Sequence, residues 1–255
     1  MLNFGFKRLF SLFLLFSSTT MLIAEEIPVE EFFCDSALSG VTLSPDGKKY
    51  AALVPINGPA CAVEEDDDPQ SARVLLVMDL ETKKPIILSG TADYARIVQF
   101  FWLNDDRIGF YKQPTRGLDA YDLWAIDVDG KNLKKLVPGK WEDGYATGAR
   151  VSFLMDDDPD HVLVEYNKRR PKYTDIYKLN IYSGRLTTLA IDPVLGNNTL
   201  MGWAIDQQGN VRGYMAMDGL KYKLYHRNNV DEDFALLREF TYQEAMFMPQ
   251  TYDYD

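Results

Sequence analysis

The chain has 255 residues, of which 46% are hydrophobic and 13% are aromatic. This composition is sufficient for a folded core and excludes an intrinsically disordered protein. The formal net charge is −11 at neutral pH. Because an acidic surface repels phosphate backbones, the charge argues against nucleic acid as a partner.

The first 24 residues have the composition of a secretory signal peptide. Lys7 and Arg8 form a short positive region, an apolar stretch follows at 9–16, and small residues lead to Ala24. This order of regions is typical of a cleaved leader, and the apolar run is short for a membrane span. We predict cleavage after Ala24, export to the periplasm or the extracellular space, and no stable membrane span afterwards. An uncleaved anchor is the alternative.

The only two cysteines, Cys34 and Cys61, are candidates for a disulfide, since an exported protein meets an oxidising compartment. The bridge would close a loop of roughly 28 residues and would stabilise the fold by about 3–4 kcal/mol in the chain-entropy model. Two free thiols are the alternative. Two cysteines without a nearby histidine fall short of a zinc site, and we predict no metal site and no cofactor.

After a lead-in segment at 25–40, a double β-hairpin recurs four times in residues 41–255. The first hairpins, each with an Asp-rich turn, begin at Leu43, Trp102, Leu154 and Trp203. The second hairpins begin at Arg73, Asp122, Asp175 and Lys221. Four strands in about 40–50 residues, repeated, are typical of β-propeller blades.

The expected fold is therefore all-β, a partial β-propeller of about four four-stranded antiparallel blades. We place the blades at about 41–90, 97–138, 150–190 and 200–240, with the start of a fifth at 246–255. Such a fold is a scaffold, so function has to come from its loops, its channel or an attached domain.

Turn chemistry and strand composition support this interpretation. Pro45 and Asp46 precede Gly47, which suits a turn that needs a positive φ. The strands at 74–78 and 123–126 are apolar on both faces, as expected for blades stacked face to face. The segment 221–226 alternates, which predicts an outer strand, and the four tryptophans are expected to pack between blades.

Charged clusters give weaker indications. The acidic runs at 64–68 and 156–158, and the segment 127–132, offer oxygen ligands of the kind that Ca²⁺ takes, but we interpret them as solvated loops. The basic turn at 168–172 is likewise interpreted as a solvated loop, with the steering of an acidic peptide as the alternative.

Residues 27–53 carry a family resemblance. The lead-in Ile27-Pro-Val-Glu-Glu-Phe-Phe33 is followed by the turn Ser44-Pro-Asp-Gly47 and the strand Tyr50-Ala-Ala-Leu53. This combination resembles the start of the prolyl oligopeptidase (S9) family of serine peptidases, above all its exported dipeptidyl-peptidase and acylaminoacyl-peptidase-like branch. The resemblance implies a propeller, followed by an α/β-hydrolase domain with a Ser-Asp-His triad.

The chain itself does not complete that catalytic machinery. The family's nucleophile lies in a Gly-x-Ser-x-Gly turn, and the sequence contains no such motif. The two histidines, His161 in a hairpin and His226 on an expected outer strand, are interpreted as structural. We therefore predict no catalytic residue in this chain, and the resemblance alone does not decide whether it acts as an enzyme.

Two functions follow from the resemblance. In the first, the chain is the N-terminal propeller fragment of an exported serine peptidase. It gates and positions peptide substrates for a missing hydrolase domain and is not catalytic alone. In the alternative, it is a stand-alone TolB-like propeller that binds a protein or peptide partner in the cell envelope. Exposed blade edges are expected to promote self-association of the fragment, whereas a stable monomer would favour the stand-alone propeller.

Overall fold

The computed structural model describes residues 38–55, 73–91, 97–113, 119–193, 198–241 and 243–244. Every regular element in these ranges is a β-strand. None of the described residues belongs to a helix that could cross a membrane. The predicted all-β class is therefore confirmed.

Four four-stranded antiparallel sheets follow one another along the chain, and we call them blades 1 to 4. Blade 1 contains β1 (Ser39–Leu43), β2 (Lys49–Pro55), β3 (Arg73–Asp79) and β4 (Pro85–Ile87). Blade 2 contains β5 (Ile97–Asn104), β6 (Arg107–Lys112), β7 (Asp122–Asp127) and β8 (Lys134–Val137). Blade 3 contains β11 (Ala149–Leu154), β12 (His161–Arg170), β13 (Tyr173–Asn180) and β14 (Leu186–Ala190). Blade 4 contains β15 (Thr199–Ile205), β16 (Val211–Asp218), β17 (Lys221–His226) and β18 (Ala235–Thr241).

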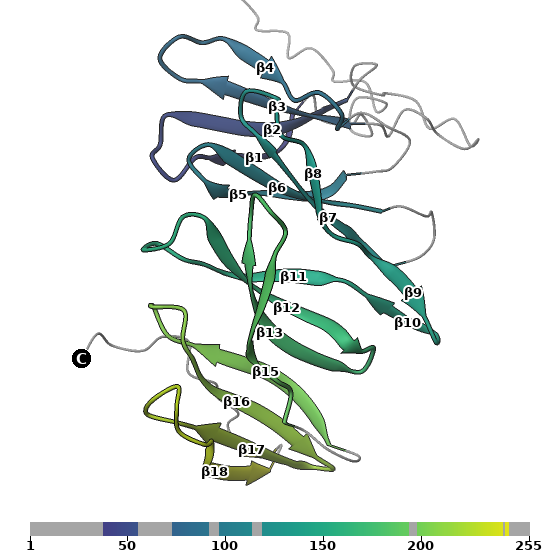
Figure 1. The fold of residues 1–255 in the computed structure, drawn as a ribbon, viewed down its shortest axis with the longest axis vertical. Helices are drawn as coiled ribbons and strands as arrows, with labels where there is room; N and C mark the ends of the chain where they lie inside the picture. Colours follow the sequence, from purple (N-terminus) through teal and green to yellow (C-terminus); the bar gives the residue numbers. More distant parts are fainter. Residues whose placement is uncertain are drawn as a thin grey trace, which may run out of the picture.

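The blades are arranged as an arc, with their first strands on its inner side. In Figure 1, the fourth strands β4 and β18 lie at opposite extremes of the molecule, whereas the first strands β1 and β15 lie toward its middle. Within each blade the strands are hydrogen-bonded in simple sequence order. This is the up-and-down order of propeller blades, so the predicted partial propeller is confirmed.

The strand order gives the arc two faces (Figure 1). The turn face carries the tight turns that join the first to the second strand and the third to the fourth strand of each blade. The opposite face, which we call the connection face, carries the turns between the second and third strands of blades 3 and 4. The turn at Gly47 has a φ of 69°, as its Ser-Pro-Asp-Gly sequence predicts.

The hydrophobic core consists of layers between neighbouring blades. The layer between blades 1 and 2 includes Leu75 and Phe110, and the layer between blades 2 and 3 includes Leu123 and Leu179. Trp203 packs between blades 3 and 4. The central strands of blades 2 and 3 bury residues on both faces because each of these blades lies between two others. This confirms the interpretation of their continuous apolar runs.

Two features of the fold differ from the sequence predictions. The segment 221–226 is β17, which pairs with β16 on one side and β18 on the other, so its predicted outer position is wrong. Its side chains alternate because the two faces of blade 4 have different surroundings. A short additional hairpin, β9 (Lys140–Glu142) and β10 (Tyr145–Thr147), was not predicted. It lies between blades 2 and 3 on the connection face (Figure 1).

The tryptophan prediction holds for three of the four residues. Trp102 and Trp203 lie in inter-blade layers, and each indole Nε1 donates to a backbone carbonyl of the preceding blade, Thr42 at 3.3 Å and Thr174 at 3.0 Å. Trp124 packs against the layer between blades 1 and 2. Trp141 is instead 48% exposed on the β9–β10 hairpin, because that hairpin belongs to no blade.

Several predictions concern residues outside the described ranges. These are the signal peptide at 1–24, the lead-in up to residue 37, the Cys34–Cys61 bridge, the acidic run at 64–68 and the fifth-blade start at 246–255.

Candidate functional site

The junction between blades 2 and 3 is closed at the turn face by a buried arginine. Arg107, 1% exposed, donates from Nε to the carbonyl oxygen of Ile181 in blade 3 at 2.9 Å. Its other nitrogens bind the carboxylate of Asp127 and the carbonyl oxygen of Asn132, which belong to blade 2. The guanidinium also lies 4.9 Å from the ring centroid of Tyr182. Every nitrogen of this side chain is therefore occupied by structure.

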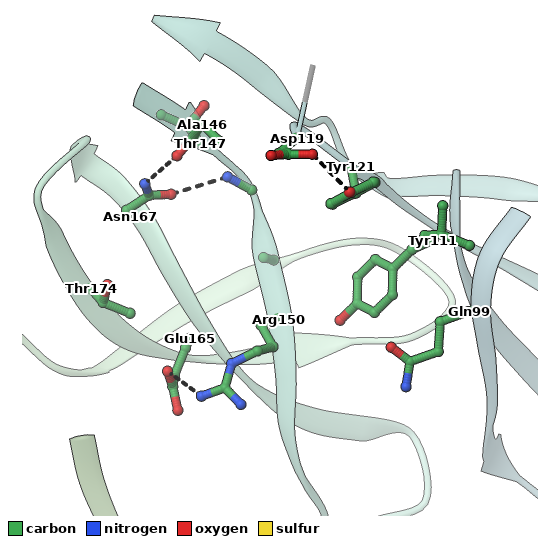
Figure 2. Close-up of a pocket in the computed structure, with 13 residues that line it drawn as sticks. Gln99, Tyr111, Asp119, Tyr121, Ala146, Thr147, Arg150, Glu165, Asn167 and Thr174 are labelled. Carbon is green, nitrogen blue, oxygen red and sulfur yellow. Dashed lines mark hydrogen bonds and ion pairs between the residues drawn. The ribbon is translucent and has the colours of Figure 1, made fainter. Parts of the chain in front are cut away.

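The same junction is open at its other end, where a cavity of about 520 Å³ lies on the connection face. Its walls come from the first strands β5 and β11, from the second strands β6 and β12, and from the β9–β10 hairpin. Figure 2 shows the side chains that line it. Those used below are Gln99, Tyr111, Asp119, Tyr121, Arg150, Glu165 and Asn167. A hollow of this size that combines apolar walls with a few polar groups is typical of a ligand site.

An ion pair occupies the inner wall of the cavity. The Nη2 atom of Arg150 lies 2.7 Å from the Oε2 atom of Glu165, and the two residues face each other across the paired strands β11 and β12. The Glu165 side chain is 18% exposed, whereas that of Arg150 is 70% exposed. The better-buried carboxylate therefore anchors a guanidinium that remains accessible from the cavity (Figure 2).

Tyr111 joins the two blades beside this pair. The amide of Val151 on β11 donates to the Tyr111 hydroxyl oxygen at 2.8 Å. Burial raises the pKa of Tyr111, so the phenol stays protonated at neutral pH. The bond gives the Val151 amide a partner. Because β11 is an edge strand of blade 3, this amide could otherwise pair with a strand of another chain.

Asn167 holds the wall that the hairpin forms. Its Nδ2 atom donates to the carbonyl oxygens of Ala146 at 2.8 Å and Pro171 at 2.9 Å, and its Oδ1 atom accepts from the Gly148 amide at 3.0 Å. Asn167 thus ties β12 to the chain segment that leads out of β10 (Figure 2). All three bonds are to backbone, so this residue positions the wall.

Two glycines allow the hairpin to approach the base of the cavity. A Cβ atom on Gly139 would lie 2.4–2.6 Å from the backbone of Tyr121, and one on Gly148 would lie 3.2 Å from the Tyr121 oxygen. The Gly139 amide donates to Asp122 Oδ1 at 2.7 Å. Blade 3 repeats this bond, since Asp175 Oδ1 accepts from the Asp192 amide at 2.8 Å. In both blades the aspartate lies at or near the start of the third strand. Its bond holds the segment that follows the fourth strand.

The histidines take no part in the cavity. His161 Nδ1 lies 2.8 Å from Asp158 Oδ1, and its Nε2 lies 3.3 Å from Asn180 Nδ2, in a turn-face network. The Ser152 hydroxyl donates instead to the carbonyl oxygen of Leu163. His226 lies on the third strand β17 and not on an outer strand. Ser152 and His161 are therefore engaged by separate partners.

Residues of the acidic run 156–158 and of the basic turn 168–172 form ion pairs within blade 3. Asp158 lies 2.6 Å from Lys178 Nζ, and this contact, with that to His161, holds the pKa of Asp158 below its usual value. In the basic turn, Arg169 binds both carboxylate oxygens of Asp175, at 2.9 Å and 3.1 Å. Within the described ranges, no group of three or more His, Cys, Asp or Glu side chains could hold a metal ion.

Sequence reasoning did not identify the cavity residues. Gln99, Tyr111, Arg150 and Glu165 belong to strands whose pairing was predicted, but a polar residue on a strand carries no signal of its own. Their common property is that they lie on first and second strands of adjacent blades, which only the stacking of the blades brings together.

Comparisons with known proteins give a sequence relative and a fold. The chain is 27% identical over 167 residues to dipeptidyl aminopeptidase BIII from Pseudoxanthomonas mexicana. The match covers 65% of this chain and 21% of the relative, so the chain spans about a fifth of that protein's length. No family model matches the chain.

Two solved structures are similar to this chain at low sequence identity. A Bacteroides ovatus protein described as a dipeptidyl aminopeptidase IV is 12% identical with a TM-score of 0.50, covering 76% of this chain and 33% of its own. TolB from Acinetobacter baumannii is 14% identical with a TM-score of 0.38, covering 78% of this chain and 40% of its own. The Bacteroides structure supports the fold alone. With the sequence match, the resemblance to the prolyl oligopeptidase family is confirmed, and the described residues are a propeller portion similar to that of its dipeptidyl-peptidase members.

Proposed function

We propose that this chain is the propeller of an exported serine peptidase, in which it admits and positions peptides while catalysis takes place elsewhere. The observation that carries the proposal is the open cavity between blades 2 and 3, with apolar walls and a few polar groups, in a chain that matches a peptidase in sequence. The cavity lies beside the first strands, on the inner side of the arc, where a peptide that enters the propeller would pass.

The chemistry of the described residues supports a non-catalytic role. Acyl transfer by a serine peptidase needs a nucleophile within hydrogen-bond reach of a base, together with an oxyanion hole. Ser152 donates to a backbone carbonyl, and His161 is engaged by Asp158 and Asn180. Because the sequence match is to a peptidase, it supports this function over that of a stand-alone TolB-like propeller.

Two measurements on the purified full chain test the proposal. A fluorescein-labelled hexapeptide should bind in a fluorescence anisotropy titration, and the chain should neither hydrolyse dipeptidyl chromogenic substrates above the buffer rate nor react with a fluorophosphonate probe. Absence of peptide binding would remove the positioning role. Probe labelling that is lost in S152A would show that catalysis resides in this chain.

Export is part of the proposal and is tested separately. The composition of residues 1–24 supports it. When the chain is expressed with its own N-terminus in a Gram-negative host, N-terminal sequencing of the periplasmic protein should begin at Glu25. A cytoplasmic protein that retains Met1 would contradict export.

A further inference from the structure

The cavity continues along the inner side of the arc as a groove. A second hollow, of about 370 Å³, is lined by residues of β5, β6 and β11. The two hollows share Gln99, Tyr111 and Arg150. These three side chains therefore lie at the middle of a groove between the first strands of blades 2 and 3.

The shared side chains are hydrogen-bond donors. A guanidinium carries five N–H groups in a planar fork and has no acceptor, and Glu165 holds the Nη2 atom of Arg150 at 2.7 Å. With the side chain 70% exposed, the remaining edge of the fork faces solvent at the groove. The anchoring carboxylate limits the motion of the guanidinium, so less rotamer entropy is lost when a ligand binds.

Tyr111 adds a second donor beside Arg150. Its oxygen already accepts from the Val151 amide, and among the described residues no acceptor is bonded to its hydroxyl hydrogen. The phenol is protonated at neutral pH, and burial raises its pKa further, so this hydrogen can be donated into the groove. Gln99 is exposed on β5 and contributes an amide that can donate or accept.

The acidic groups near the groove do not cancel this preference. Glu165 is engaged by Arg150, and the Asp119 carboxylate lies at the connection-face end, where it accepts from the Tyr121 hydroxyl at 3.3 Å. The shared middle of the groove thus presents a guanidinium fork and a phenol donor. Paired N–H donors of this kind bind carboxylates with two parallel hydrogen bonds.

We propose that this groove is a subsite for a peptide carboxylate, with Arg150 as its main binding group and Tyr111 as a second donor. The proposal rests on the function proposed above and specifies the peptides that the propeller prefers. The carboxylate can come from a peptide C-terminus or from an acidic side chain, since both present the same two oxygens.

The test is a set of matched probes on the full chain. Fluorescein-labelled alanine–glycine hexapeptides are titrated as the C-terminal acid, the C-terminal amide, the amide with one internal Glu, and the amide with one internal Gln. We expect the free acid or the Glu peptide to bind about tenfold more tightly than its neutral match, as charge-assisted bonds imply. The comparison of these two pairs shows which source of carboxylate is used.

Variants connect the preference to the groove. R150Q should abolish the difference between acid and amide, R150K should retain part of it because the charge stays while the fork is lost, and R185Q should leave it unchanged. Arg185 is a matched control, an exposed arginine on the turn face. Thermal unfolding of each variant shows that the fold is intact.

The possible outcomes separate the two proposals. If all four peptides bind equally and R150Q changes nothing, the carboxylate subsite is wrong while peptide binding by the propeller stands. If no peptide binds, both proposals fail. If the preference for the acid survives in R150Q, the carboxylate is bound elsewhere and this assignment is wrong.

Discussion

The two ends of the junction between blades 2 and 3 are built in different ways. At the turn face, the Arg107 guanidinium is buried and every nitrogen has a partner. At the inner groove, Arg150 is exposed and a carboxylate holds one of its nitrogens. The same residue type thus fixes the blades at one end and remains accessible at the other.

This difference indicates where the junction can bind a ligand without losing its geometry. The layer of apolar residues between blades 2 and 3, which includes Val162 and Leu179, packs tightly and sets their spacing. Arg107 adds polar bonds that depend on this spacing. The open end can then keep unsatisfied donors in place, which is the preorganisation that a binding site requires.

Removing the buried arginine should have the largest effect on stability. R107A removes the cation beside Asp127, which keeps its bond from Asn132 Nδ2, and removes donors from two carbonyl oxygens. Breaking a buried ion pair in this way costs about 3–5 kcal/mol. Urea unfolding of the purified chain measures the loss. R185A, at an exposed arginine on the same face, should change the free energy of unfolding by less than about 0.5 kcal/mol. Equal effects of the two variants would show that Arg107 does not hold the junction.

Alanine substitutions at Gly139 and Gly148, next to the β9–β10 hairpin, should lower the free energy of unfolding by different amounts. In G139A the new methyl group would lie 2.4–2.6 Å from the Tyr121 backbone, so the segment must shift, at a cost of about 1–3 kcal/mol. In G148A the distance is 3.2 Å, and the cost should be smaller. Urea unfolding of both variants measures the difference. A larger loss for G148A would contradict this packing at the base of the cavity.

The tyrosine that bridges the blades should have a modest effect. Y111F deletes the acceptor of the Val151 amide, and the loss of one such bond costs about 1 kcal/mol. Because the groove lets water reach the freed amide, the cost should stay near this value. Hydrogen exchange at Val151 should become faster in the variant. Unchanged exchange at that amide would show that the bond does not form in solution.

Tyr214, between blades 3 and 4, should make the stability of the chain depend on pH above pH 10. Burial, with a smaller contribution from nearby Tyr225, raises the pKa of Tyr214 to about 12. The folded chain therefore keeps this proton at pH values where the unfolded chain, with a tyrosine pKa near 10, loses it. The stabilisation is complete below pH 10 and is lost as the pH rises toward 12.

Denaturant unfolding between pH 9 and pH 12 measures this loss. The free energy of unfolding should fall less steeply in Y214F, because phenylalanine has no proton to release. Parallel curves for the variant and the wild-type chain would show that Tyr214 titrates normally in the folded state.

The blade repeat could be predicted from the sequence because it depends on local chemistry. The turn at Pro45-Asp46-Gly47 and the two-faced apolar run at 123–126 each specify their own conformation. The third strands at Asp122 and Asp175 carry a further signal, an aspartate that accepts a backbone bond from a residue 17 positions later. The two aspartates were visible in the sequence at or near the start of the third strands of blades 2 and 3, but their backbone partners became known only from the structure.

The candidate site could not be predicted in the same way, because it depends on contacts between blades. Arg150 and Tyr111 are 39 positions apart and meet only when two sheets stack. The β9–β10 hairpin was missed because its strands have three residues each, too few for a period of two to be recognised. Trp141 was misassigned for the same reason.

Hydrogen–deuterium exchange of the full chain, with and without the acidic hexapeptide, tests most directly whether the open end of the blade 2–3 junction is the binding end. We predict slower exchange on peptide addition at residues 97–101 and 146–152, which line the groove, and unchanged exchange at 104–107 and 158–161 on the turn face. Protection of the turn face with no change in the groove would contradict the assignment of the two ends.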